Sequence, residues 1–213
     1  LKASNCRPDL SIRINRLKTD RNSLTRELEK EGIEVRPGNL SPRALILLSG
    51  KGVFTTSAYK NGKFSVQDEA SIFAADTIGA LPGENVIDMC AAPGGKAAAM
   101  AEMMENRGTL TACDIFDHKL ELIKDQAQRL GIENIKVRLA DGRNGDPSMA
   151  ESADRVLVDA PCSGLGVIRR RPEIRYRSAE GISDIIQIQK MILQNASSYV
   201  KEGGTLMYST CTV

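Results

Sequence analysis

The stretch NVIDMCAAPGGKAAAM, residues 85–100, joins an apolar strand to a helix through a glycine loop. Gly94 and Gly95 allow a tight turn, and the alanines after them favour a helix. The alternation continues, with expected strands at 85–90, 109–114, 134–141, 155–161 and 203–210 separated by helices. This pattern predicts an α/β fold with a doubly wound parallel sheet, whose ligands bind at the carboxyl ends of the strands.

Residues 1–62 have a different pattern, which predicts a small basic β-α-β module with strands at 11–18, 33–38 and 44–50 and a helix at 23–32. Ser23 is the expected N-cap of that helix. Residues 1–66 carry 13 Lys and Arg against 6 Asp and Glu, whereas the rest of the chain has a net charge of −5. This asymmetry fits either a polyanionic partner or a solvated basic face. Residues 63–213 form the second expected domain.

The composition is that of an ordinary globular protein, with 41% hydrophobic and 26% charged residues among 213. Its apolar runs reach about five residues, whereas a membrane-spanning helix needs roughly 20. The five cysteines include no C-x-x-C pair, and the single histidine is His118. These counts argue against a zinc site and a disulfide framework and favour a reducing, cytoplasmic setting. We expect the protein to be a monomer that binds no metal. Because the chain begins on Leu1, we also expect it to be a piece of a longer protein.

The glycine loop CAAPGGK, residues 90–96, differs from two familiar phosphate-binding loops. A Walker A loop requires glycine in place of Cys90 and serine or threonine in place of Ala97. The dinucleotide fingerprint G-x-G-x-x-G is absent as well. With Pro93 in the turn, the loop suits a ligand other than a pyrophosphate, and a plain strand-to-helix turn is the alternative.

Three aspartates close consecutive predicted strands: Asp114 the second, Asp141 the third and Asp159 the fourth. Parallel strands place all three on one rim. A carboxylate after the second strand suits a ribose diol, and one after the third can accept from an exocyclic amine. Each alone is more often a turn or N-cap residue. Together with the loop they predict a nucleoside-like ligand, and S-adenosylmethionine fits best.

Five motifs occur in order along the chain: FSVQDEAS, CAAPGGK, DAPCSG, RRRPEIRYR and STCT. Together they closely resemble the NOL/NOP/Sun family of RNA cytosine-C5 methyltransferases, and most closely its bacterial Sun type, which modifies 16S ribosomal RNA. The resemblance implies a Rossmann-like S-adenosylmethionine-dependent methyltransferase sheet preceded by a small α+β RNA-binding module. It departs at Ala97, where relatives often have threonine, and after Cys211, where further strands are expected. We therefore expect a chain of this length alone to be weakly active or inactive.

The resemblance also implies roles for individual residues. Cys211 would be the nucleophile, Cys162 would assist product release, Asp159 would lie between cofactor and target base, and Lys96 would face the active site. The implied cofactor-binding residues are Cys90, Ala91, Ala92, Pro93, Gly94, Gly95, Lys96, Asp114, Asp141 and Asp159. The RRRPEIRYR segment would bind RNA by phosphate contacts and base stacking, unless it is a solvated loop; its candidates are Arg169, Arg170, Arg171, Arg175, Tyr176 and Arg177.

The chemistry explains why two thiols are useful. Cytosine C5 attacks a methyl sulfonium only after a thiolate has added to C6, and Asp159 is the candidate acid at N3. After methyl transfer, a second thiol can aid loss of the C5 proton and elimination of the first thiol from C6. The fourth and fifth strands can be adjacent, so Cys162 and Cys211 should be neighbours, and Lys96 could lower a thiol pKa.

Three alternatives remain open at this stage. In the first, Cys162 is the nucleophile, as the corresponding cysteine is in DNA cytosine methyltransferases. In the second, the protein is a non-catalytic RNA-binding protein on a degenerate methyltransferase fold. In the third, both thiols are merely small buried hydrophobic groups. Of the other cysteines, Cys90 is expected to be a small residue of the cofactor loop and Cys113 a core residue.

Overall fold

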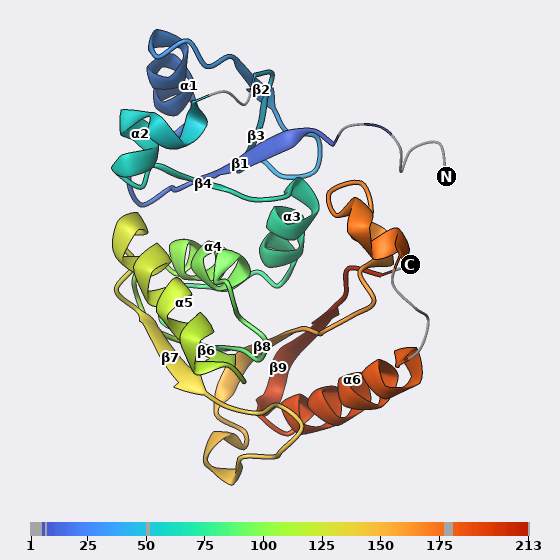
Figure 1. The fold of residues 1–213 in the computed structure, drawn as a ribbon. Helices are drawn as coiled ribbons and strands as arrows, with labels where there is room; N and C mark the ends of the chain where they lie inside the picture. Colours follow the sequence, from blue (N-terminus) through green and yellow to red (C-terminus); the bar gives the residue numbers. More distant parts are fainter. Residues whose placement is uncertain (1–5, 7, 50–51, 177–180, 213) are drawn as a thin grey trace.

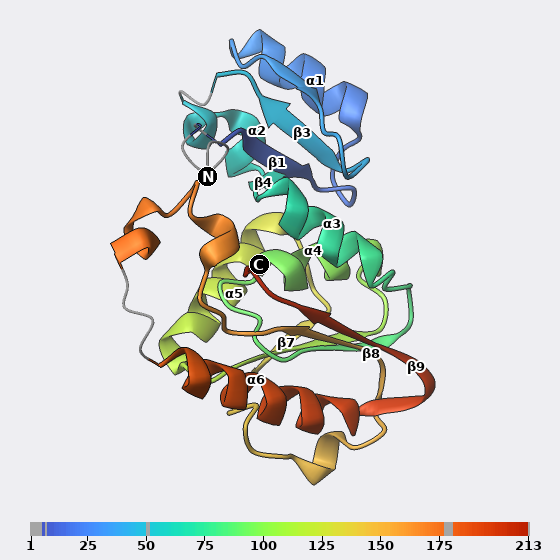
Figure 2. The same ribbon diagram turned by 90° about the vertical axis from the view of Figure 1, so that its right-hand side faces the viewer.

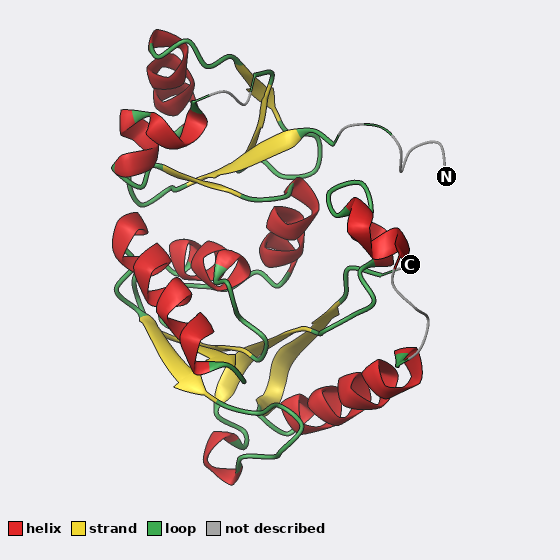
Figure 3. Ribbon diagram, viewed as in Figure 1, coloured by secondary structure: helices red, strands yellow, loops and turns green. Residues whose placement is uncertain are grey.

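The computed structural model describes residues 6, 8–49, 52–176 and 181–212. Figure 1 shows two sheets, one formed by the N-terminal part of the chain and one by the rest, and Figure 3 shows the same view coloured by secondary structure. Among the described residues, none of the helices combines the length and the apolar composition that crossing a lipid bilayer requires.

The N-terminal sheet has four strands in the order β2-β3-β1-β4, and all neighbouring pairs are antiparallel. Its elements are β1 (Leu10–Ile14), α1 (Arg21–Lys30), β2 (Val35–Pro37), β3 (Ala44–Leu47), α2 (Ser57–Lys60) and β4 (Phe64–Val66). The sequence interpretation did not include β4, which lies beyond residue 62 and pairs with β1. The expected cap of α1 is wrong: Asp20 is the N-cap, and its side chain accepts from the backbone N–H of Ser23 at 3.0 Å.

The second sheet has five parallel strands in the order β7-β6-β5-β8-β9. This confirms the predicted doubly wound α/β fold. Its strands are β5 (Asn85–Asp88), β6 (Thr109–Asp114), β7 (Ile135–Leu139), β8 (Ala153–Asp159) and β9 (Val200–Ser209). The helices around it are α3 (Glu69–Thr77), α4 (Gly95–Met103), α5 (Asp117–Leu130) and α6 (Ile182–Ser197).

Helices cover both faces of the parallel sheet. Figures 1 and 2 agree in placing α4 and α5 on one face, with α3 beside α4, and α6 on the other. Four apolar residues of α5 recur at helical spacing and are buried; they are Leu120, Ile123, Ala127 and Leu130. Ile192 and Ala196 of α6 are buried against the opposite face.

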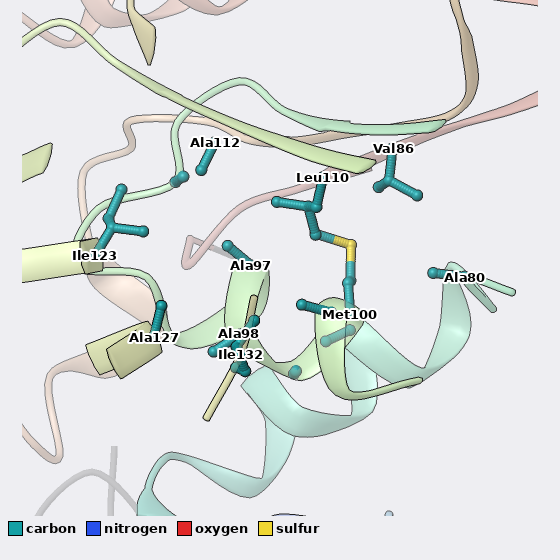
Figure 4. Close-up of a cluster of buried hydrophobic side chains, with 14 of the residues drawn as sticks. Ala80, Val86, Ala97, Ala98, Met100, Leu110, Ala112, Ile123, Ala127 and Ile132 are labelled. Carbon is teal, nitrogen blue, oxygen red and sulfur yellow. The ribbon is translucent and has the colours of Figure 1, made fainter. Parts of the chain in front are cut away.

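The alanine-rich start of α4 explains how this helix lies so close to the sheet. Ala97, Ala98 and Ala99 are at most 1% exposed. Small side chains let the helix backbone approach the strands, and Met100 then fills the space toward Leu110 (Figure 4). This packing fixes the helix that directly follows the glycine loop.

Candidate functional site

A cavity of about 540 Å³ opens at the carboxyl ends of the parallel strands, where ligands of such sheets bind. Five of the residues predicted to bind a cofactor line it: Cys90, Ala92, Asp114, Asp141 and Asp159. The remaining wall is mainly apolar and was not predicted from the sequence; it includes Met89, Ile115, Phe116, Ala140, Pro161, Ile188 and Ile192.

Asp114 ends β6 and is only 7% exposed. Its Oδ1 accepts from the backbone N–H of Phe116 at 3.0 Å, and its Oδ2 accepts from that of Ala92 at 3.3 Å. These bonds hold the carboxylate at the cavity wall while leaving lone pairs for a ligand hydroxyl. The position suits the predicted role of binding a ribose diol.

Asp141 also lines the cavity, but it already has a strong partner. Arg143 donates from Nε and Nη2 to the two carboxylate oxygens at distances between 2.6 and 3.0 Å. These hydrogen bonds from Arg143 lower the pKa of Asp141. Asp141 is therefore a fixed anion at the rim, with Arg143 beside it as a further lining residue.

Asp159 ends β8 and forms an ion pair with Lys96, whose Nζ lies 2.6 Å from Oδ2. The Lys96 side chain is 16% exposed and the Asp159 side chain 30% exposed. Lys96 was expected to act on a thiol, yet the structure pairs it with the carboxylate. This pair links the start of α4 to the end of β8 across the top of the sheet.

The other predicted loop residues shape the site without lining the cavity. Ala91 is buried in the core between α4 and the sheet. Gly94 has φ +100°, and a Cβ at this position would lie 3.3 Å from the Cα of Ile123. Gly94 therefore has to be glycine for two reasons, its backbone angle and the close approach of α5. Pro93 precedes it, and Gly95 begins α4.

Asp88 was missed by the sequence interpretation, although it ends β5 just as Asp114 and Asp159 end their strands. It is 1% exposed. Burial raises the pKa of Asp88 to about 7, with Asp159 adding to the rise and Lys96 opposing it. The same rule that selected the other strand-ending acids would have found it.

Cys162 and Cys211 lie together, as predicted from the adjacency of β8 and β9. Their Cα atoms are 6.2 Å apart. The two segments are joined by the N–H of Gly166, which donates to the Cys211 carbonyl at 2.9 Å, and by a hydroxyl contact of 2.7 Å between Ser163 and Thr212. The structure joins the two sulfurs in a disulfide, a single pair 49 residues apart in sequence rather than the disulfide framework that the cysteine spacing argues against.

The other two cysteines of the methyltransferase core are poor nucleophiles. Burial raises the pKa of Cys90 and that of Cys113 to about 12. A thiol with such a pKa stays protonated at neutral pH. Cys113 is 0% exposed in the core, as expected.

The arginine-rich segment lies outside the cavity and is partly committed to other contacts. Arg170 forms an ion pair with Asp68, the residue that caps α3. Arg169 donates to the carbonyl of Cys6 at 3.2 Å. Arg171 and Arg175 are exposed, and Tyr176 is 89% exposed, which suits stacking on a base. Arg177 lies outside the described residues.

A five-stranded parallel sheet, a carboxylate-lined cavity at its carboxyl edge and a CAAPGGK loop that differs from the known phosphate-binding loops are the features of a Rossmann-like methyltransferase. The family model "16S rRNA methyltransferase RsmB/F" matches residues 77–213, and the model for the ferredoxin-like domain of RsmF/B-like methyltransferases matches residues 1–53. The chain belongs to the RsmB/F family.

Individual relatives agree with this assignment. The chain is 44% identical to the probable ribosomal RNA small subunit methyltransferase B of Bacillus subtilis, across 97% of the chain and 46% of that relative. It is 34% identical to the ribosomal RNA small subunit methyltransferase B of Photorhabdus laumondii, across 100% of the chain and 50% of that relative. The chain thus spans about half the length of the curated relatives it matches.

Solved structures support the same fold. The crystal structure of PH0851 superposes with a TM-score of 0.94 at 38% identity, covering 100% of this chain and 48% of that one. A methyltransferase homolog from Pyrococcus horikoshii superposes with a TM-score of 0.88 at 28% identity, covering 100% of this chain and 67% of that one.

Proposed function

We propose that the chain transfers a methyl group from S-adenosylmethionine to C5 of a cytidine in RNA, with 16S ribosomal RNA as the expected substrate and the cytoplasm as the expected location. The observation that carries this proposal is the meeting of Cys162 and Cys211 just beyond the ends of β8 and β9, where Asp159 is the last residue of β8. Two thiols placed together fit a reaction that needs one to attack and one to assist release.

The cavity fits the proposed cofactor. Asp114 is positioned for the ribose hydroxyls, and the apolar side chains of Ile115, Phe116 and Ile192 suit an adenine ring. The cofactor, when bound, supplies an electrophilic methyl group on a sulfonium. Carboxylates such as Asp114 and Asp159 attract this positive charge, whereas they would repel a negatively charged phosphate ligand.

The proposed role of the protein's own residues follows from their positions. The Cys211 thiolate adds to C6 of the cytosine, while Asp159, held by Lys96, contacts N3 as the candidate acid. This addition makes C5 nucleophilic enough to accept the methyl group. Cys162 then assists loss of the C5 proton and expulsion of the Cys211 thiolate, which restores the C5–C6 double bond.

The test of this function is a methyl-transfer assay with labelled S-adenosylmethionine and unmodified 16S ribosomal RNA, followed by nucleoside analysis. Label recovered as 5-methylcytidine is expected. Failure of the folded protein to bind S-adenosylmethionine in calorimetry would instead favour the non-catalytic RNA-binding alternative. Label in another nucleoside would contradict the proposed position of transfer.

Activity is also expected to depend on a reducing agent, since neither thiol can react while joined in the disulfide. Protein prepared without reductant should be inactive and show three free thiols after denaturation, those of Cys6, Cys90 and Cys113. Dithiothreitol should restore activity and raise the thiol count to the full five. Full activity of protein that retains the disulfide would contradict this expectation.

A further inference from the structure

One face of the N-terminal sheet is buried against the methyltransferase core. Ile12 and Ile14 of β1 pack beneath α1. Ser11 and Arg13 point to the opposite face, because side chains alternate along a strand. Arg13 is 0% exposed, and the hydroxyl of Ser11 donates to the carbonyl of Gln67 at 2.7 Å. This face is therefore an interface between the two parts of the protein.

The guanidinium of Arg13 contacts both ends of α4. Its Nε and Nη2 donate to the carboxylate of Glu102 at 3.0 and 2.8 Å, near the end of the helix. Its Nη1 donates to the carbonyl of Gly95 at 2.7 Å and to Oε1 of Gln67. Gly95 is the first residue of α4 and lies in the CAAPGGK loop.

Arg43, the residue just before β3, is a second buried arginine on the same interface. Its Nη1 donates to the carbonyl of Ala99 at 3.0 Å, and its Nε donates to Asp76 at 2.7 Å. It also lies 3.6 Å from a carboxylate oxygen of Glu102. Arg43 is 4% exposed, so it resembles Arg13 in burial and pairing. Its bond to α4 is at mid-helix, one turn beyond the glycine loop.

We propose that Arg13 is a positioning residue for the cofactor site. Its bond to Gly95 fixes the junction between the glycine loop and α4, and hence the direction of Lys96, the next residue, whose ammonium pairs with Asp159. None of the residues lining the cavity comes from the N-terminal sheet. The N-terminal module thus shapes the cofactor site through one buried side chain.

Moving Arg13 away from its partners on α4 would be unfavourable in free energy. It would leave Glu102 as a buried carboxylate without its main partner, which is strongly unfavourable. The planar guanidinium can serve Glu102, Gln67 and Gly95 at once, whereas a lysine ammonium is a single point charge that cannot reach all three. Arg13→Lys therefore preserves the charge while releasing the loop.

The experiment compares Arg13→Lys with Arg43→Lys, a matched change of a buried arginine in the same interface. S-adenosylmethionine affinity is measured by calorimetry and stability by thermal unfolding. Arg13→Lys is expected to weaken binding about tenfold, the effect of losing one charge-assisted hydrogen bond, whereas Arg43→Lys stays within about twofold at a similar loss of stability. Equal weakening in both variants, or wild-type affinity in Arg13→Lys, would overturn the proposal.

A second measurement tests the role of Arg13 independently of the proposed function, on which the expected change in S-adenosylmethionine affinity rests. Without cofactor, hydrogen exchange of the amides at residues 95–99 should be faster in Arg13→Lys than in Arg43→Lys. If the wild-type protein binds no S-adenosylmethionine, the proposed function fails while the exchange comparison still decides the role of Arg13. If Arg13→Lys does not fold, the double variant Arg13→Leu, Glu102→Gln decides, since it removes the bond to Gly95 without leaving Glu102 as an unpaired buried carboxylate. Faster exchange at residues 95–99 than in Arg43→Lys supports the proposal, and wild-type exchange overturns it.

Discussion

Cys211→Ala is expected to transfer methyl groups at least about 10³-fold more slowly than the wild-type protein, as is usual when a covalent nucleophile is removed. The physical reason is that C5 of cytosine gains its nucleophilicity only from the adduct at C6. Cys211 lies two residues beyond β9 and is exposed, so its thiol can meet a base once the disulfide is reduced. The measurement is transfer of labelled methyl to ribosomal RNA under reducing conditions.

Cys6→Ala is the control for this change, because Cys6 is an exposed cysteine outside both sheets. It should keep wild-type activity. An active Cys211→Ala protein together with an inactive Cys162→Ala protein would exchange the two roles, giving the arrangement known from DNA cytosine methyltransferases. Cofactor affinity should be unchanged in Cys211→Ala, since Cys211 does not line the cavity.

Asp159→Asn is expected to lower the turnover number by about 10²-fold, the lower range for loss of a general acid or base. The substitution removes the charge that holds Lys96 and the group proposed to act at N3. Steady-state kinetics should show the loss mainly in kcat, because Asp114 and the apolar wall still bind the cofactor.

Asp154→Asn is a matched control on the same strand. Asp154 pairs with Lys201 at 2.7 Å, almost the same geometry as the pair of Asp159 with Lys96, but it lies near the opposite end of β8, away from the cavity. It should lower stability without changing kcat. An equal fall in kcat for both variants would mean that the effect of Asp159→Asn is structural, and unaltered kcat in Asp159→Asn would remove Asp159 from the mechanism.

The parallel sheet and its helices were predictable because they depend on local periodicity. The pattern of α5 is an example, since Leu120, Ile123, Ala127 and Leu130 are spaced for one helical face and all four are buried. In contrast β4 has only three residues, too few to show an alternating pattern, and its pairing with β1 is decided by tertiary contacts.

The candidate site was predictable where residues end strands, as Asp114 and Asp159 do. The contacts between distant segments were not. Arg13 and Arg43 counted as part of a basic surface in the sequence, yet both are buried against α4 and so are not available to RNA. The charge of a residue is visible in the sequence, whereas the acidic partner that lets it be buried is visible only in the fold.

The most direct test of the two-thiol mechanism is to incubate reduced Cys162→Ala protein with S-adenosylmethionine and unmodified 16S ribosomal RNA and to analyse the mixture by denaturing gel and mass spectrometry. The account predicts a covalent protein–RNA adduct joined through Cys211, because attack proceeds while release fails, and no such adduct in the Cys162→Ala, Cys211→Ala double variant. Normal turnover by Cys162→Ala without any adduct, or an adduct that persists in the double variant, would contradict it.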